Sequence, residues 1–148
     1  MDGIKFWLQK GMQRALQGKT DAAMDYYRQG LRKNVTNLTL IYNLANSYKK
    51  LKKYSNALTW FMHGISLHPR WVDGLCGLAT TYFNMRDYDQ ALRFITVAKD
   101  NCKGVKDGET FVLDFKTIGF IKAVCLKMTH EFKSSGLEYG YLQETFKQ

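Results

Sequence analysis

Apolar residues recur along this chain at intervals of three and four positions, and no segment alternates strictly between apolar and polar residues. The first spacing is typical of helices with one buried face, whereas strict alternation would indicate a half-buried strand. Proline occurs once, at Pro69, so few positions prevent a helix from forming. The pattern therefore predicts an all-α protein.

The same pattern returns at an offset of 34 residues, as when Leu44-Ala45 returns as Leu78-Ala79. Further matches relate two repeats each: Tyr48 to Tyr82; Tyr54 to Tyr88; Ala57-Leu58 to Ala91-Leu92; Ala23 to Ala57; and Tyr27 to Phe61. Columns that run through all three repeats include Trp7, Ile41 and Leu75; and Gly30, Gly64 and Ala98. A period of this length indicates stacked supersecondary units.

Each unit is predicted to be a pair of packed helices. In the best-matched unit, one helix face carries Leu44, Ala45 and Tyr48, and the facing helix carries Ala57, Phe61 and Gly64. The small residues of this set allow the two backbones to approach closely, and the large ones fill the remaining space. One hairpin cannot bury both of its apolar faces, so neighbouring hairpins must stack.

These columns resemble the tetratricopeptide repeat family, whose pattern of about 34 residues has leucine, a small residue, tyrosine, alanine, phenylalanine and proline at set places. Residues 38–71 match almost completely, with Ile41, Leu44, Ala45, Tyr48, Tyr54, Ala57, Phe61, Gly64 and Pro69. Residues 72–105 match with Leu75, Leu78, Ala79, Tyr82, Tyr88, Ala91, Ile95 and Ala98, but have Lys103 at the proline position. Residues 4–37 keep Trp7, Gly11, Ala23, Tyr27 and Gly30 and depart at Lys10, Arg14 and Val35. The resemblance implies a solenoid of about three helical-hairpin repeats.

Residues 106–148 do not follow the repeat in register. After a glycine-bearing break at 103–108, the apolar residues predict one long helix to about Leu126 and a second helix at about 130–147. Phe115, Ile118 and Gly119 imitate the start of a further repeat. We expect a degenerate hairpin that caps the stack, because a solenoid end needs its apolar face covered, so residues 1–148 form one domain. The alternative is that its aromatic residues form an interface with another chain or domain.

The resemblance implies that the first helices of successive units line a concave groove for a peptide or protein partner. The predicted groove residues are Gln9, Met12, Thr39, Tyr42, Asn43, Asn46, Lys49, Lys50, Thr80, Phe83 and Asn84. Asparagine is a poor helix former, so Asn43 and Asn46 within one helix indicate a use for their amides, namely pairing with the backbone of an extended peptide. Tyr42 and Phe83 are the expected apolar anchors. A merely solvated polar face is the alternative.

Some members of this family clamp the C-terminal carboxylate of heat-shock chaperones with lysine, asparagine and arginine side chains. The matching positions of this sequence are Leu8, Met12, Asn43, Asp73 and Gly77. Only Asn43 agrees, and Asp73 has the charge that repels a carboxylate. Chaperone tails are therefore unlikely partners on sequence grounds, and we predict that they do not bind.

The positive charge is concentrated in the middle of the chain. The sequence has 22 basic and 13 acidic residues, a net charge of +9. The span 26–72 has no acidic residue and eight basic ones, namely Arg28, Arg32, Lys33, Lys49, Lys50, Lys52, Lys53 and Arg70. Cations at helix C-termini explain part of this set. In a repeat hairpin the rest form two rims beside the groove, which favours an acidic protein segment. Nucleic acid bound by this span, in a subunit of a larger complex, is the alternative.

The sequence shows no pattern of catalytic or metal-binding residues. Cys76, Cys102 and Cys125 are odd in number and far apart, and His63 and His68 miss the spacing of a helical metal pair. We expect reduced thiols in a cytoplasmic or nuclear protein. There is no phosphate-binding loop, nucleophile elbow or zinc-protease motif. Nor is there an apolar run that would span a membrane or a secretory signal. The chain is predicted to be non-enzymatic, without a cofactor.

Overall fold

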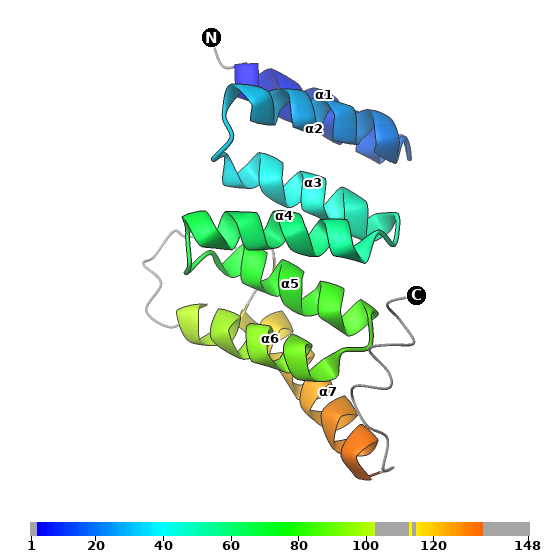
Figure 1. Cartoon of the computed structure of the whole chain (residues 1–148), viewed down its shortest axis with the longest axis vertical. Helices are drawn as coiled ribbons and strands as arrows, with labels where there is room; N and C mark the ends of the chain where they lie inside the picture. The colour runs from blue at the N-terminus through cyan, green and yellow to red at the C-terminus, as the bar shows by residue number, and fades with distance from the viewer. Residues whose placement is uncertain (1–2, 103–112, 114, 135–148) are drawn as a thin grey trace. The chain divides into compact units, whose positions relative to one another are not determined.

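The computed structural model describes residues 3–102, 113 and 115–134 of the chain. These residues form seven α-helices and no strand, which confirms the all-α prediction (Figure 1). The helices are α1 (Gly3–Leu16), α2 (Thr20–Lys33), α3 (Leu38–Lys50), α4 (Tyr54–Leu67), α5 (Val72–Asn84), α6 (Tyr88–Cys102) and α7 (Phe115–Ser134). The first six form three helix pairs that coincide with the predicted repeats 4–37, 38–71 and 72–105, except that α1 begins one residue earlier, at Gly3.

The chain divides into two compact units, Met1–Pro69 and Arg70–Gln148. The first unit contains the hairpins α1–α2 and α3–α4, and the second contains the hairpin α5–α6 followed by α7. The division falls between the second and third predicted repeats. Each unit therefore presents its own first helices, and its binding surface is described separately below.

The core of the first unit consists of the residues that define the repeat columns. Its fully buried side chains include Ala23, Tyr27, Leu40, Ile41, Leu44, Ala45, Ala57 and Phe61. Gly30 shows how closely the helices approach, because a Cβ atom there would lie 2.9 Å from Leu40 Cδ1 and 3.0 Å from Trp7 Cβ. Gly11 is similarly restricted, since a Cβ atom there would overlap the Tyr27 ring. The predicted packing of small against large residues is confirmed.

Each of the three hairpins turns on a residue with left-handed backbone geometry. These residues are Gly18, Lys52 and Arg86, with φ of 76°, 60° and 62°, and they lie one repeat apart in sequence. In the second hairpin, Lys52 N–H donates to the Lys49 carbonyl (3.0 Å) and Lys53 N–H donates to the Tyr48 carbonyl (2.9 Å). The other two hairpins have the same pair of bonds. This arrangement satisfies carbonyls that a helix C-terminus would otherwise leave unpaired.

The second unit is built on α5, whose buried residues include Leu75, Leu78 and Ala79. Helices α6 and α7 pack against each other, and Ile118 and Cys125 of α7 are completely buried. Helix α7 continues through the point near residue 127 where the sequence pattern suggested a break. The second helix of the predicted cap hairpin lies, beyond Ser134, outside the described residues, so the cap stays a prediction.

Candidate functional site

Helix α3 has one face in the core and one face that is open to solvent. Its core face consists of Leu40, Ile41, Leu44 and Ala45, none of which is exposed, and Tyr48, which is 9% exposed. The opposite face carries the six predicted groove residues of this repeat. Tyr42, Asn43, Asn46 and Lys49 are half-buried, and Thr39 and Lys50 are exposed. The structure thus places these six residues on one surface, as the sequence predicts.

Two of these side chains are held by contacts inside the first unit. The Asn43 side-chain amide donates to the Thr39 carbonyl at 2.8 Å, one turn earlier in α3. The Tyr42 ring meets the Phe61 ring edge-on, with 6.0 Å between their centroids. Tyr42 is therefore a rigid aromatic surface that costs little entropy to bury. Asn43 has part of its donor capacity engaged, so its side-chain carbonyl is the group that would meet a peptide N–H.

Helix α1 contributes a more apolar surface to the same unit. Gln9 and Met12 are exposed, as the groove prediction requires. Met12 is 47% exposed and Leu16, one turn later, is 89% exposed. Exposed methionine and leucine side chains adapt to irregular apolar partners. The first unit therefore combines an apolar surface on α1 with a polar and cationic surface on α3.

In the second unit, the predicted groove residues line a pocket between α5 and α7. Thr80, Phe83 and Asn84 of α5 meet Phe120, Ile121 and Val124 of α7 around a pocket of about 180 Å³. Phe83 is held edge-on against Tyr88, with 5.2 Å between ring centroids. Phe120 is 70% exposed. An exposed aromatic ring beside an apolar pocket is typical of a protein-binding surface.

Sequence reasoning missed the α7 side of this pocket, although a signal for it exists. Phe120 and Val124 lie 40 positions after Thr80 and Asn84, because six additional residues separate the third hairpin from α7. An offset of 40 also relates Leu78-Ala79 to Ile118-Gly119. Allowing a longer connection before the last helix would have identified Phe120 and Val124 as groove residues.

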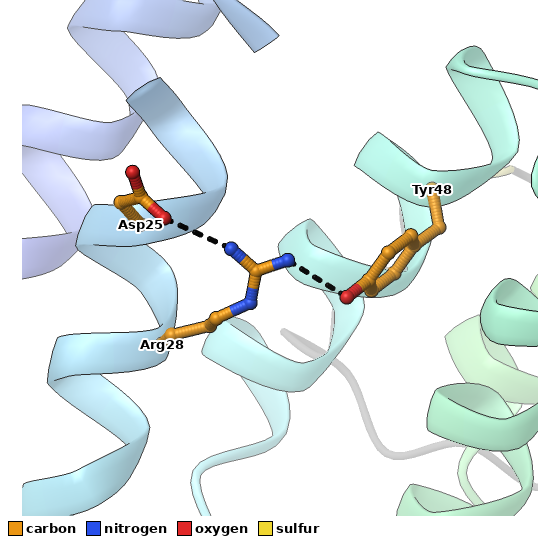
Figure 2. Close-up of polar contacts among 3 residues, drawn as sticks. All are labelled: Asp25, Arg28 and Tyr48. Atoms are coloured by element: carbon orange, nitrogen blue, oxygen red, sulfur yellow. Dashed lines mark hydrogen bonds and ion pairs between the residues drawn. The ribbon is translucent and has the colours of Figure 1, made fainter. Parts of the chain in front are cut away.

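Arg28 is bonded to neighbouring side chains of the first unit (Figure 2). It belongs to the basic patch, which we define as the six basic residues of the span 26–72 that are not predicted groove residues, namely Arg28, Arg32, Lys33, Lys52, Lys53 and Arg70. Its guanidinium donates to Asp25 Oδ1 at 3.0 Å and to the Tyr48 hydroxyl at 2.8 Å. These bonds, the Tyr48 bond first, raise the pKa of Arg28 despite some desolvation. Asp25 lies just before the acid-free span, so the charge of Arg28 is locally compensated. The remaining patch residues, namely Arg32, Lys33, Lys52, Lys53 and Arg70, are exposed.

Lys49 and Lys50, adjacent in sequence, have different environments. Lys50 is exposed, whereas Lys49 is half-buried and desolvation lowers its pKa. A partly desolvated ammonium gains more from a carboxylate partner than an exposed one does, because water screens it less. This pair gives the α3 surface a cationic end next to the exposed Lys52 and Lys53 of the following turn.

The cysteines have the properties expected of inert core thiols. All three are free; Cys76 and Cys125 are buried and Cys102 is half-buried. Burial raises the pKa of Cys76 to about 12 and that of Cys125 to about 11. In the part of the chain that the structure describes, no cluster of histidine, cysteine or acidic residues is suited to hold a metal ion. Among the described helices, none has the length and hydropathy that a membrane crossing requires.

Comparison with known families and structures agrees with this geometry. The model of the tetratricopeptide repeat family matches residues 38–70, which are the repeat that the sequence pattern identified as the best. A search of curated protein sequences finds no match to the chain.

Three solved structures illustrate the similarity of fold. The Sgt2 TPR domain from Aspergillus fumigatus has a TM-score of 0.77 and 16% identity over 90% of this chain and 83% of its own. The TPR2B domain of yeast Sti1 in a pHsp70 complex has a TM-score of 0.74 and 16% identity, over 84% and 97%. The first TPR of Spaghetti (RPAP3), bound to an HSP90 peptide, has a TM-score of 0.69 and 18% identity, over 85% and 93%. At these identities the similarity establishes the fold alone.

Proposed function

We propose that this chain, which has the fold of the tetratricopeptide repeat family, is a non-enzymatic scaffold or adaptor that binds a segment of a protein partner along its first helices. The observation that carries this proposal is the solvent-open face of α3, which carries six of the predicted groove residues opposite the buried face. The pocket between α5 and α7, which Thr80, Phe83 and Asn84 line, supports it from the second unit. The similar structures include one that is bound to an HSP90 peptide and one that is a pHsp70 complex, which supports a protein-binding role.

The binding surface of each unit is largely preorganised. Tyr42 and Phe83 are each held by an aromatic neighbour of their own unit, and Asn43 is held by its own helix. Because these groups need not be rearranged, the entropy cost of binding comes mainly from ordering the partner. Asn43 and Asn46 pair with the partner's backbone, and Tyr42 and Phe83 are the apolar anchors.

The partner segment is acidic where it passes the end of α3. Lys49 and Lys50 lie on the groove surface and Lys52 and Lys53 follow in the turn, so carboxylates there are attracted at long range and in contact. We expect binding to weaken by roughly threefold to tenfold between low and physiological salt, as for a few screened charge pairs.

Chaperone tails remain unlikely partners for this chain. Two similar structures have heat-shock protein ligands, which runs counter to this expectation. At the corresponding positions, however, this chain lacks most of the charged and amide side chains that form the carboxylate clamp. Leu8 has no charge, Gly77 is buried, and the Asn43 amide already donates within α3. We expect no micromolar binding of a peptide ending in EEVD. Micromolar binding that Asn43→Ala abolishes would contradict this prediction.

Affinity capture from a cell extract tests the proposed function. The bait variant Asn46→Ala with Lys50→Ala removes two groove groups, and the matched control Met62→Ala with His63→Ala removes two exposed groups of α4, a second helix of a hairpin. We expect the groove variant to lose the specific partners and the control to keep them. Loss in the control alone would show that the partner docks on the second helices and would refute the groove.

Nucleic acid stays the second candidate because Lys50, Lys52 and Lys53 are exposed within four residues of each other. If these cations hold phosphates, the logarithm of the affinity for duplex DNA should fall with the logarithm of salt concentration with a slope of about −0.9 per contact. Charge reversal at the three lysines should then abolish binding in a salt titration. Unchanged DNA affinity after reversal would remove this site from consideration.

A further inference from the structure

The pocket between α5 and α7 has the size and lining of a site for a single apolar side chain. Phe83, Phe120, Ile121 and Val124 supply its apolar surface. The hydroxyl of Thr80, which also lines the pocket, donates to the Cys76 carbonyl at 3.0 Å within its own helix, so this donor is already satisfied. An apolar cavity of about 150 Å³ admits a benzene ring, and this pocket measures about 180 Å³. A phenylalanine or leucine side chain therefore fits.

The charges beside the pocket are predominantly positive. Helix α7 carries Lys116, Lys122, Lys127 and Lys133 against one acid, Glu131. Exposed Lys116 lies one turn before Phe120, and exposed Lys127 lies one turn after Val124. The helical period places both lysines on the same face as Phe120.

The acidic residues of these elements offset the two lysines unequally. Asp73 lies two turns before Thr80 in α5. Glu131 lies two turns after Val124 in α7 and four residues after Lys127, a spacing at which it offsets part of the charge of that lysine. Asp87 is only 8% exposed, and its carboxylate accepts the Gln90 N–H at the start of α6 (3.3 Å). Within one turn of the pocket, the exposed charges along α7 are therefore cationic.

We propose that the α5–α7 pocket receives one bulky apolar side chain from a partner protein, and that acidic residues flank this side chain on both sides in the partner sequence. This inference rests on the proposed function and specifies the chemistry of the partner at that site. The apolar side chain supplies affinity by displacing water from the pocket. The flanking carboxylates select the partner through Lys116 and Lys127, because a basic or neutral segment gains nothing there.

A direct binding measurement on the full chain tests the inference. The probe is a fluorescein-labelled peptide of about twelve residues, capped at both ends, with one phenylalanine between two pairs of glutamates in a glycine–serine background. Two control peptides replace the phenylalanine by alanine or all glutamates by glutamine. Fluorescence anisotropy gives the dissociation constant of each peptide for each protein variant.

The informative variants are on α7, where substitution leaves the core intact. Phe120→Ala should weaken the probe by about tenfold or more, as loss of an anchor contact does. Leu126→Ala, at a residue that is 49% exposed, is the matched control and should have no effect. Lys116→Glu with Lys127→Glu should weaken the probe by about fivefold or more at low salt, and Lys133→Glu should not. The alanine and glutamine peptides should bind the unchanged protein correspondingly less well.

The opposite results would overturn the inference. Equal binding of all three peptides, or binding that Phe120→Ala leaves unchanged, would show that the pocket is not the site. The chain's own segment 135–148 also contains aromatic and acidic residues, so the full-length variant Phe146→Ser is measured as well. An affinity about tenfold higher in that variant would show that this segment, and not a separate partner, takes the pocket. If capture still depends on Asn46 and Lys50 while the probe ignores Phe120, only this inference fails and the groove function stands.

Discussion

Replacing Lys52 by glycine should stabilise the protein, although it removes every side-chain atom beyond Cα. Lys52 has φ of 60°, in the left-handed region that L-residues other than glycine disfavour. The first hairpin has Gly18 at the corresponding position, with φ of 76°. The backbone bonds that fix the turn involve N–H and carbonyl groups, which Lys52→Gly retains.

The size of the effect is a difference of two terms. Left-handed geometry costs a non-glycine residue roughly 1–2 kcal/mol. Glycine loses about 0.5–1 kcal/mol more conformational entropy on folding than other residues do. The side chain itself contributes only a few tenths of a kcal/mol, through its charge near the C-terminus of α3. The net expectation is a gain of about 0.5 kcal/mol in the free energy of unfolding, or a rise of roughly 1–2 °C in Tm.

Urea unfolding followed by circular dichroism measures this change as a shift of the midpoint to higher urea at unchanged slope. Lys50→Gly is the matched control, because Lys50 is the last residue of α3 and has no left-handed geometry that glycine could relieve. Glycine there should lower the free energy of unfolding by up to about 1 kcal/mol. Gly18→Ala is the reciprocal test and should destabilise by about 1 kcal/mol. If Lys52→Gly lowered the midpoint as Lys50→Gly does, left-handed strain would not be the determinant of this turn.

Three further substitutions test the close helix packing, a partly buried hydrogen bond and a buried thiol of the same fold. Gly11→Ala should destabilise by about 1–3 kcal/mol despite better helix propensity, because the new Cβ overlaps the Tyr27 ring; an unchanged Tm would contradict the close approach. Tyr48→Phe removes the hydroxyl that accepts from Arg28 at 2.8 Å and should lower the free energy of unfolding, measured in urea, by about 1 kcal/mol. An unchanged free energy of unfolding would contradict a stabilising role for this bond. Burial raises the pKa of Cys76 from 9.0, its value in the unfolded chain, to about 12. The thiol therefore stays protonated in the folded chain at a pH at which it ionises in the unfolded chain. Stability linked to this thiol is complete below pH 9 and falls between about pH 9 and 12, and Cys76→Ala should flatten that fall in an alkaline unfolding series.

The fold follows closely from the sequence because its columns carry the packing. Gly11, Ala45 and Ala79 occupy one column, and all are buried where helices meet. Only a small residue fits at such a position, so its recurrence in the sequence identifies the repeats. The helix pairs accordingly coincide closely with the predicted repeats. The single left-handed column at 18, 52 and 86 was not identified, because lysine and arginine at two of its positions hide the glycine signal that marks such turns.

The site follows from the sequence less completely, for two physical reasons. The repeat register identifies the α3 side chains that lie opposite the buried face. It ends before α7, so Phe120 and Val124 were not assigned. A count of charged residues in the sequence also does not show which of them form ion pairs. Arg28 is paired with Asp25, so the charge available to a partner is smaller than the acid-free span suggests.

Each helix of a hairpin has a buried face and an exposed face, and the two faces are under different physical constraints. In α4, Ala57, Phe61 and Gly64 are buried at the spacing of a helix face, and substituting them would create a cavity or an overlap. In α3, Asn46 and Lys50 lie opposite the buried face, where polar residues cost little stability. Substitutions at such surface positions therefore change the surface that a partner would meet while the core packing stays the same. This independence of surface and core is a physical reason why the same fold can be shared with structures at only 16–18% identity.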